Sequence, residues 1–518
     1  MSAKDSEPAV DPGAVHDEEA PGPAISVPES NDTGEGGKLK MIMQLVKKCF
    51  GVKDIAAMRL SLPASLLEPI PNLEYWHYLD RPDVFASIND SEDPFERMLA
   101  VVKFTFTKDL KFVHGKICKP YNSVLGEHFR AHWDVVPASN DFVTSSTRAA
   151  DQASLAPETA SIRSGKSSKS TRSGLSLLSK PGKSPSTAPT SVEAQMSDLS
   201  LEEQRTRIVF LTEQVSHHPP VSSYYAACPD RHIEMYGTDQ ISAKVSGTTV
   251  RVLPGQHNKG IYIKLTGGPG AGEEYRITHP SASVNGVLRG NFYATMTEST
   301  IITCDGAKPG LPKFRTIIEY KEESWLGKAH FLVEGVIHTV HDGDEPWTKV
   351  KAVPHNRVVA IFDGSWRGKI RWRRSDNSEY EDLIDLAALQ PLPKSVRSLE
   401  EMDEYESRKL WGKVTEHLTN KEYSEATREK IEIEQRQRDL ASERKKKGEE
   451  FVPKYFDKDI STGYATLTDA GKKVVEEIMK DAPGKDAKPS EPAKEDDKEA
   501  KDPAPEDTPE AAKAPLPA

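Results

Sequence analysis

The sequence is poor in features that mark several large classes of protein. It has four cysteines among 518 residues, and no two of them stand at CxxC spacing. Neither a zinc ribbon nor a dense disulfide framework is therefore indicated. The chain also lacks any run of about 18 apolar residues, and its first residues, MSAKDSEPAVDPG, contain no apolar core of the kind a secretory signal needs. We expect a soluble, cytoplasmic protein in a reducing compartment.

A basic excess and the common catalytic motifs are missing as well. The formal net charge is −11, which argues against a general nucleic-acid-binding protein. There is no GxxxxGK[ST] phosphate loop and no HExxH motif. The GSWRG sequence at 364–368 has its serine in second place, so it is not a GxSxG nucleophile elbow. We expect no enzyme, no metal and no cofactor, and we interpret the glycine-rich GGPGAGEE at 267–274 as a hairpin loop.

Three stretches contain few large apolar side chains. They are an acidic tail at 1–37, a Ser/Lys-rich insert at 139–205 and a charged tail at 482–518. Such compositions cannot bury enough apolar surface to offset the entropy of ordering, so we predict disorder in all three. Strand-like sequence resumes at RIVFL, which favours a surface loop within one domain for the insert. A linker between two domains is the alternative.

Apolar periodicity predicts the regular elements. In KLKMIMQLVKKCF the residues Leu39, Ile42, Met43, Val46 and Phe50 follow a helical stripe. This helix could pack on its own core, lie on a membrane surface or cover an apolar cavity. A second helix is predicted at DPFERMLAVVKFTF, with Asp93 as N-cap and Pro94 in the first position.

The middle of the chain has the pattern of a β protein. Strand signals dominate from Thr206 to about Trp372, without intervening helices. This favours an antiparallel sheet or barrel over a parallel α/β sheet. Helical sequence returns at 399–447, and a last helix is predicted at 469–480.

Three polar features could bind a ligand. The first is EQVSHHPP at 213–220, where two prolines force an extended path beside His217 and His218. Neighbours on a strand point to opposite faces, which makes a shared metal site awkward. The residues alone leave structural histidines, anion binding and metal or catalytic roles open.

The second feature is the helical sequence TREKIEIEQRQRDL, in which Lys430, Glu434 and Arg438 recur every four residues on nearly one face. This row could bind a phosphate or could be a solvated salt-bridge ladder. The third is KPYNSVLGE at 119–127, a turn that carries Lys119 and Asn122. Both side chains could equally be simply solvated.

The segment EQVSHHPP resembles the signature of the oxysterol-binding protein-related family of lipid-transfer proteins. The segments KPYNSVLGE at 119–127, ESRKLW at 406–411, KIEIEQRQR at 430–438 and FVPKYF at 451–456 support this resemblance and occur in the family's order. It spans about residues 38–457. Because only 37 residues precede the lid region, we expect a short, fungal-type member without a pleckstrin-homology domain. Ser123 departs from the family, since many relatives have proline there.

The resemblance implies a β-dominated α+β fold. We expect an incomplete antiparallel β-barrel that encloses a hydrophobic tunnel, with an N-terminal lid and flanking C-terminal helices. One lipid-binding domain would then occupy 38–481, with the lid region at 38–70 and the 139–205 insert extruded from it. The lid or tunnel candidates are Leu39, Ile42, Val46, Leu66 and Leu67.

The resemblance also implies a function. The protein would bind phosphatidylinositol 4-phosphate and exchange it for a sterol or phosphatidylserine, touching endoplasmic reticulum, Golgi or plasma membranes peripherally and transiently. It would bind no nucleic acid, and its protein partners are not specified. The implied headgroup-binding residues are Lys119, Asn122, His217, His218, Lys430, Glu434 and Arg438, with Glu434 orienting the two cations. A lipid sensor or scaffold is the alternative, and a hydrolase using His217 or His218 as base is a third reading.

Overall fold

The computed structural model describes most of the chain between residues 25 and 481. The described residues are 25–26, 35–49, 51–52, 54–55, 60–62, 64–114, 119–139, 205–246, 249–285, 293–322, 329–344 and 346–481. The predicted disordered segments therefore lie largely outside the described residues. Within the predicted N-terminal tail the structure differs, because Ile25–Ser26 forms strand β1 and helix α1 (Glu35–Lys48) begins before Leu39. Strand β1 pairs in parallel with β2 (Leu60–Ser61).

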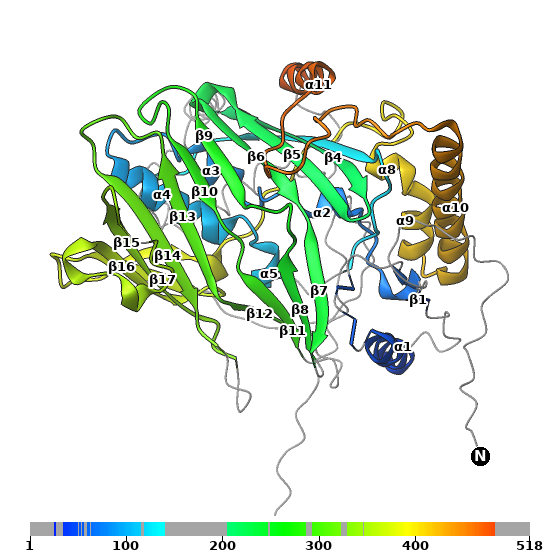
Figure 1. Cartoon of the computed structure of the whole chain (residues 1–518), viewed down its shortest axis with the longest axis horizontal. Coiled ribbons are helices and arrows are strands. Elements are labelled where there is room, and N and C mark those ends of the chain that lie inside the picture. The colour runs from blue at the N-terminus through cyan, green and yellow to red at the C-terminus, as the bar shows by residue number, and fades with distance from the viewer. Residues whose placement is uncertain are drawn as a thin grey trace, which may run out of the picture.

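A twelve-stranded antiparallel sheet is the framework of the molecule (Figure 1). Its strand order is β18-β17-β16-β15-β14-β13-β10-β9-β6-β5-β4-β3, so β18 and β3 are its two edges and the barrel is not closed. The strands are β3 (His128–Val135), β4 (Thr206–His217), β5 (Pro220–Cys228), β6 (Ile233–Asp239), β9 (Ile261–Leu265), β10 (Glu274–Ile277), β13 (Ser299–Asp305), β14 (Lys313–Tyr320), β15 (Leu332–Val340), β16 (Val358–Ser365), β17 (Lys369–Arg374) and β18 (Glu381–Asp385). The predicted incomplete antiparallel barrel is confirmed.

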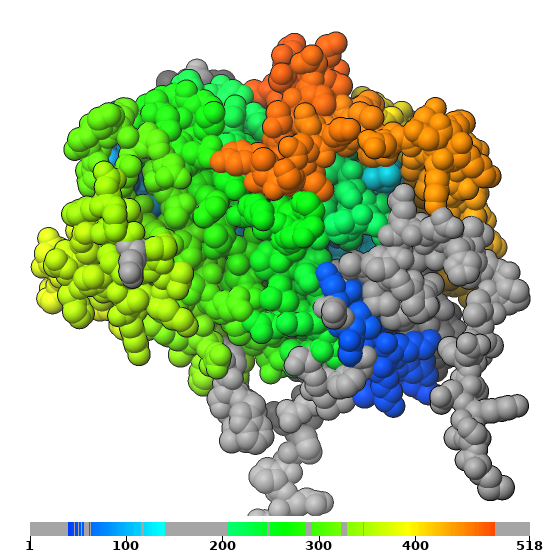
Figure 2. All heavy atoms as spheres, viewed as in Figure 1, coloured from blue at the N-terminus to red at the C-terminus, as the bar shows by residue number. Residues whose placement is uncertain are grey.

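A second sheet of four strands stands beside the first. Its order is β12-β11-β8-β7, from β7 (Ile241–Ser246), β8 (Thr249–Pro254), β11 (Ser281–Asn285) and β12 (Tyr293–Thr297). The segment after α1 bonds to the β7 edge, where Ala243 donates to Asp54 Oδ1 at 2.8 Å and accepts from the Ile55 amide. This contact holds the end of α1 next to the second sheet, as Figure 2 shows in blue and green.

The two ends of the predicted insert are neighbours in the main sheet. Strand β3 pairs with β4 along its whole length, and Val135 lies opposite Thr206. The predicted hairpin at 267–274 is likewise confirmed, because it joins the antiparallel strands β9 and β10. The division of the chain into lid, lipid-binding domain and tails stays a prediction.

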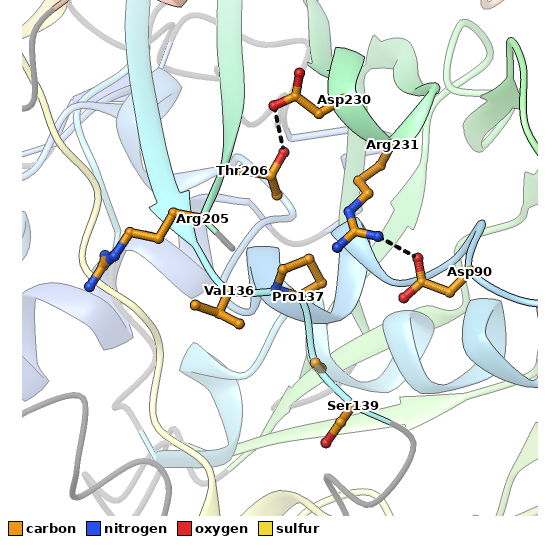
Figure 3. Close-up of a pocket in the computed structure, with 9 residues that line it drawn as sticks. Asp90, Val136, Pro137, Ser139, Arg205, Thr206, Asp230 and Arg231 are labelled. Carbon is orange, nitrogen blue, oxygen red and sulfur yellow. Dashed lines mark hydrogen bonds and ion pairs between the residues drawn. The ribbon is translucent and has the colours of Figure 1, made fainter. Parts of the chain in front are cut away.

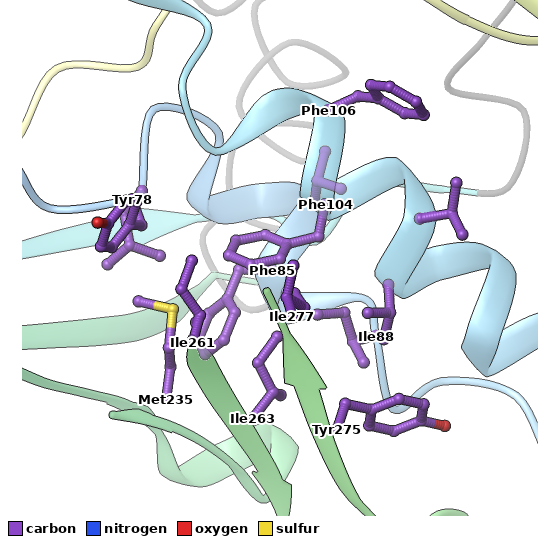
Figure 4. Packing of buried hydrophobic residues seen from close by; sticks show 14 of the residues in the cluster. Tyr78, Phe85, Ile88, Phe104, Phe106, Met235, Ile261, Ile263, Tyr275 and Ile277 are labelled. Carbon is purple, nitrogen blue, oxygen red and sulfur yellow. The ribbon is translucent and has the colours of Figure 1, made fainter. Parts of the chain in front are cut away.

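Short helices pack against the inner face of the sheet. They are α2 (Asn72–Tyr75), α3 (Pro82–Ala86), α4 (Pro94–Thr107) and α5 (Lys111–His114). In Figure 4, Phe85 and Phe104 extend from α3 and α4 toward Ile261, and their ring centroids are 5.6 Å apart. Helix α4 begins as predicted, since the Asp93 side chain accepts from the Phe95 amide and Pro94 is the first helical residue.

The C-terminal helices lie on the outside of the barrel. They are α8 (Ser407–Leu410), α9 (Gly412–Thr419), α10 (Tyr423–Lys447) and α11 (Asp469–Lys480). The last helix has the predicted bounds. The prediction of helix from 399 is wrong by eight residues, because Ser398–Glu401 and Asp403–Glu406 form turns first. Figure 2 shows the C-terminal segment, in orange, crossing the outer face of the green strands.

A buried ion pair fixes α4 to the turn between β9 and β10. Arg97 Nε donates to Glu273 Oε2 at 2.8 Å, Nη2 bonds the other carboxylate oxygen, and neither residue is more than 1% exposed. Tyr275 Oη also donates to Glu273, at 2.7 Å. Because both side chains are removed from water, each charge is stabilised by the other, and loss of one leaves the other buried without compensation.

We predict that Arg97→Met lowers the free energy of unfolding by about 3–5 kcal/mol, because it leaves the Glu273 carboxylate buried without its counter-charge. Urea denaturation measures this. The double variant Arg97→Met/Glu273→Met should regain most of the loss. Arg371→Met, which removes an exposed partner of Asp363, should change stability by less than about 1 kcal/mol. Equal losses in the two single variants would contradict the prediction.

Candidate functional site

The two histidines stand at the tip of the β4–β5 hairpin. His217 ends β4 and lies opposite Pro220, which begins β5, and the His218–Pro219 peptide is cis. His217 is exposed and His218 half-buried. Their ring centroids are 4.5 Å apart. The expectation that they point to opposite faces is wrong, because the strand ends at His217 and the turn brings both imidazoles together.

In the turn at 119–127 the two predicted headgroup-binding residues, Lys119 and Asn122, are hydrogen-bonded to each other. Lys119 Nζ donates to Asn122 Oδ1 at 2.7 Å and to the Pro120 carbonyl at 2.9 Å. Asn122 is exposed, whereas Tyr121 and Ser123 on either side are buried. The backbone is therefore anchored while the Lys119–Asn122 pair remains at the surface.

The three predicted residues of α10, Lys430, Glu434 and Arg438, differ in burial and in their partners. Lys430 is 5% exposed and its Nζ lies 2.6 Å from Glu434 Oε1. Arg438 is half-buried, and its Nε donates to Gln435 Oε1 at 3.2 Å. The structure thus brings Lys430 and Glu434 into contact, as the helical spacing predicts, and Arg438 lies one turn further along.

The turn at 119–127 is the common neighbour of the other two features. On one side Gly126 donates to the Gln214 carbonyl at 3.0 Å and Gln214 donates to the Glu127 carbonyl at 2.8 Å, which attaches the turn to β4. On the other side the ring centroids of Tyr121 and Trp411 at the start of α9 are 5.0 Å apart. Helices α9 and α10 pack together with Tyr121 in one apolar cluster.

Two buried glutamates join the segments that carry the sequence resemblance. Glu213 accepts from the backbone amides of residues 454, 455 and 456, at 2.7, 2.8 and 3.3 Å. Glu127 accepts from Ser407 Oγ at 2.7 Å and Trp411 Nε1 at 3.0 Å. Burial raises the pKa of both carboxyls, and the hydrogen bonds oppose that rise. Sequence reasoning missed these roles, although a glutamate within an apolar strand such as RIVFLTEQV was a signal.

The structure describes the side chains of only some of the predicted lid residues. The side chains of Leu39 and Val46 lie outside the described residues, and Ile42 is half-buried. The most buried described positions of α1 and its end are Met41 and Cys49, neither of which is among the predicted lid candidates.

Leu66 and Leu67 follow the short 3₁₀ helix at Ala64–Leu66. Leu66 is half-buried, and Leu67 belongs to the apolar cluster that supports the 119–127 turn. The Glu68 amide donates to the Lys119 carbonyl at 3.0 Å. The end of the predicted lid region is therefore attached directly to the turn that carries Lys119.

A polar group beside the core was not predicted from sequence. Tyr78 Oη donates to Asp239 Oδ1 at 2.8 Å, Lys108 Nζ lies 5.2 Å from the Tyr78 ring centroid, and the rings of Tyr78 and His279 are 5.6 Å apart. Burial raises the pKa of Asp239 to about 7 and lowers the pKa of His279 to about 3. These residues come from four separate segments, so no local pattern could have joined them.

A pocket of about 470 Å³ lies at the two ends of the predicted insert (Figure 3). Residues 136–139 and Thr206 line it, with the Arg231–Asp90 ion pair at 3.1 Å and the Thr206–Asp230 hydrogen bond at 3.1 Å. None of the predicted headgroup residues lines this pocket. Among the residues the structure describes, no three metal-ligating side chains are grouped to hold an ion, and no helix is long and apolar enough to cross a membrane.

Comparison with known proteins places these features in a family. Residues 41–417 match the family model described as oxysterol-binding protein. Oxysterol-binding protein-like protein 1 of Schizosaccharomyces pombe is 40% identical over 491 residues, which cover 86% of this chain and 92% of that protein. Oxysterol-binding protein homolog 7 of Saccharomyces cerevisiae is 26% identical over 426 residues, or 82% and 76% of the two chains.

Solved structures share the fold. The Osh1 ORD domain in complex with cholesterol has a TM-score of 0.53 at 19% identity and covers 84% of this chain and 88% of its own. The Osh3 ORD in complex with PI(4)P from Saccharomyces cerevisiae has a TM-score of 0.51 at 14% identity, with coverage of 86% and 94%. The likeness concerns the arrangement of the sheet and helices.

We predict that Glu213→Gln lowers the free energy of unfolding by about 1–3 kcal/mol, because an amide cannot accept from three converging backbone N–H groups. Urea denaturation gives the change, and hydrogen exchange should show faster exchange at the amides of 454–456. The exposed Glu416 offers a control, since Glu416→Gln should stay within about 0.5 kcal/mol of the parent. Unchanged protection of the three amides would refute this role.

Proposed function

The chain belongs to the oxysterol-binding protein family, and on that basis we propose that it binds phosphatidylinositol 4-phosphate and exchanges it for a sterol between membranes. Proteins of this family bind lipids and are not enzymes. The observation that carries the proposal is the 119–127 turn, which presents Lys119 with Asn122 and is attached both to the histidine hairpin and to the helices that carry Lys430.

The headgroup would bind through converging donors. A phosphomonoester carries up to two negative charges, and each charge-assisted hydrogen bond contributes about 1.5–3 kcal/mol. Lys119 and Lys430 would act as point charges, whereas Arg438 can bind two oxygens at once. His217 and His218 would donate to the same phosphate when protonated. Glu434 repels phosphate, so its contact with Lys430 supports an orienting role.

The rest of the affinity would come from burial of the lipid's apolar part. Each methylene removed from water contributes about 0.8 kcal/mol, so an enclosed tunnel can compete with a bilayer. We call the proposed headgroup site, formed by the 119–127 turn, the His217–His218 tip and the Lys430 end of α10, the mouth. The hydrogen bond of the Glu68 amide to the Lys119 carbonyl supports a lid whose position depends on whether the mouth is occupied. Exchange would then need no chemistry, only opening at one membrane and closure around a different lipid.

A sterol and phosphatidylserine are the two candidates for the second lipid. The polar group of Tyr78, Lys108, Asp239 and His279 favours a sterol. Its donors and acceptors suit a hydroxyl at the buried end of the lipid, which a sterol has and the acyl chains of phosphatidylserine lack.

The test is transfer of phosphatidylinositol 4-phosphate between liposomes. We predict that His217→Ala/His218→Ala lowers the transfer rate at least tenfold, while the exposed His355→Ala leaves it unchanged. Acceptor liposomes with sterol should accelerate transfer more than those with phosphatidylserine. Stoichiometric binding without turnover would favour a sensor or scaffold. Absence of binding by the parent protein would overturn the proposal.

A second prediction concerns α10. Lys430→Met should weaken binding of phosphatidylinositol 4-phosphate vesicles about tenfold, since the buried ammonium would no longer face the phosphate. Arg428→Met is the matched control two residues away, because the Arg428 side chain is 64% exposed. Equilibrium flotation with vesicles measures both, and circular dichroism checks that each variant is folded. Equal weakening in both variants would indicate a general charge effect instead.

A further inference from the structure

A second group of cations lies on the outer face of the sheet. Arg315 in β14 pairs directly with His338 in β15, so their side chains share one face about 5 Å apart at Cβ. Ile317 and Val336 lie on that face and pack under Val353, whereas Phe314 points into the barrel core. Strands β14 and β15 are at the opposite end of the molecule from α10 in Figure 1.

The loop after β15 closes over this face. Arg357 Nη2 donates to Asp344 Oδ1 at 2.7 Å, and Asp344 Oδ2 accepts from the His341 amide at 2.7 Å. The Trp347 ring meets the His338 ring edge-on, with centroids 5.3 Å apart. His338 is 1% exposed, while Arg315 and Arg357 are half-buried and reach solvent. His338 is therefore covered, whereas the two arginines each keep part of their surface exposed.

Three nitrogen atoms of this group lack hydrogen-bond partners among the described residues. They are Arg315 Nε, Arg357 Nη1 and His338 Nε2, all of them buried. Each unmet buried polar atom destabilises the folded state, and more so when it is charged. Native proteins usually satisfy such atoms with water or an ion. The charged groups that act on His338 are Arg315, Arg357 and Asp344, and Arg276 is a further cation that acts on Arg315, so cations outnumber carboxylates in this group.

The hydrogen bond of His338 specifies the kind of ligand. Its Nδ1 lies 3.0 Å from the Thr339 carbonyl oxygen, and a carbonyl can only accept, so Nδ1 carries a hydrogen. Burial and the two arginines lower the pKa of His338, which keeps the ring neutral and leaves a lone pair on Nε2. A fitting ligand must accept from the arginines and donate one proton to Nε2. Hydrogen phosphate does both, whereas sulfate has no proton to donate at neutral pH.

We propose that Arg315, His338 and Arg357 form a binding site for a proton-bearing phosphate group on the outer face of the sheet, separate from the headgroup site. The phosphate could belong to a free solute or to a lipid headgroup. The site does not depend on the proposed lipid exchange, because none of its residues belongs to the mouth.

The test uses the full chain with His217→Ala/His218→Ala, so that phosphate binding at the mouth is weakened. Inorganic phosphate should raise the melting temperature of this protein at constant ionic strength and pH 7, and sulfate should raise it less. Adding Arg315→Gln should abolish the phosphate effect. Adding Arg371→Gln, the exposed arginine of β17, should preserve it. An equal response of the Arg315→Gln and Arg371→Gln proteins would overturn the site.

Two further measurements complete the test. Phosphorus NMR line broadening by the protein should disappear with Arg357→Gln as well, which guards against a folding defect peculiar to one variant. Equal stabilisation by sulfate and phosphate would overturn the assigned role of His338.

In the same background, binding of inorganic phosphate would support a soluble ligand. Binding only of vesicles with phosphatidylinositol 4-phosphate, lost with Arg315→Gln, would assign the site to a lipid headgroup, and no binding of either would refute it.

Discussion

The carboxylate of Glu213 is the constraint on which the arrangement of the proposed headgroup-binding residues depends. It stands four residues before His217 in β4 and binds three consecutive amides of a segment some 240 residues later in the chain. Because Val215 and Val221 on both sides of the hairpin pack against Tyr455 and Phe456, the histidine tip is held from outside the barrel. The C-terminal segment thus supports the proposed binding site, although it contributes no predicted ligand contact.

Glu127 has the same role for the neighbouring turn. It binds Ser407 and Trp411, and the turn in turn bonds β4. Elements from five parts of the sequence are therefore held by two desolvated carboxylates and one apolar cluster. The proposed headgroup site would bring several cations close together against their repulsion, and this backbone anchoring acts beside the Lys430–Glu434 ion pair in holding them there.

The sequence was informative where local chemistry decides structure. Asp93 and Pro94 predicted the start of α4, and the residue patterns predicted an antiparallel β fold and the last helix. Contacts between distant segments were not predictable in this way. The segment after α1 meets β7 through Asp54 and Ile55, and Glu213 binds amides about 240 residues away in the chain. Lys430 and Glu434 met as predicted because a helix alone determines their distance.

The pairing of Val135 with Thr206 has a consequence for how this chain can vary. Since both ends of the intervening segment are fixed by neighbouring strands of one sheet, its length is almost decoupled from the stability of the barrel. The closure entropy of a loop grows slowly with its length, by about 0.6 kcal/mol for each doubling. The connection between β3 and β4 is thus a position where sequences can be added, removed or exchanged during evolution. For the same reason it should tolerate insertion of a fluorescent reporter without disrupting the sheet.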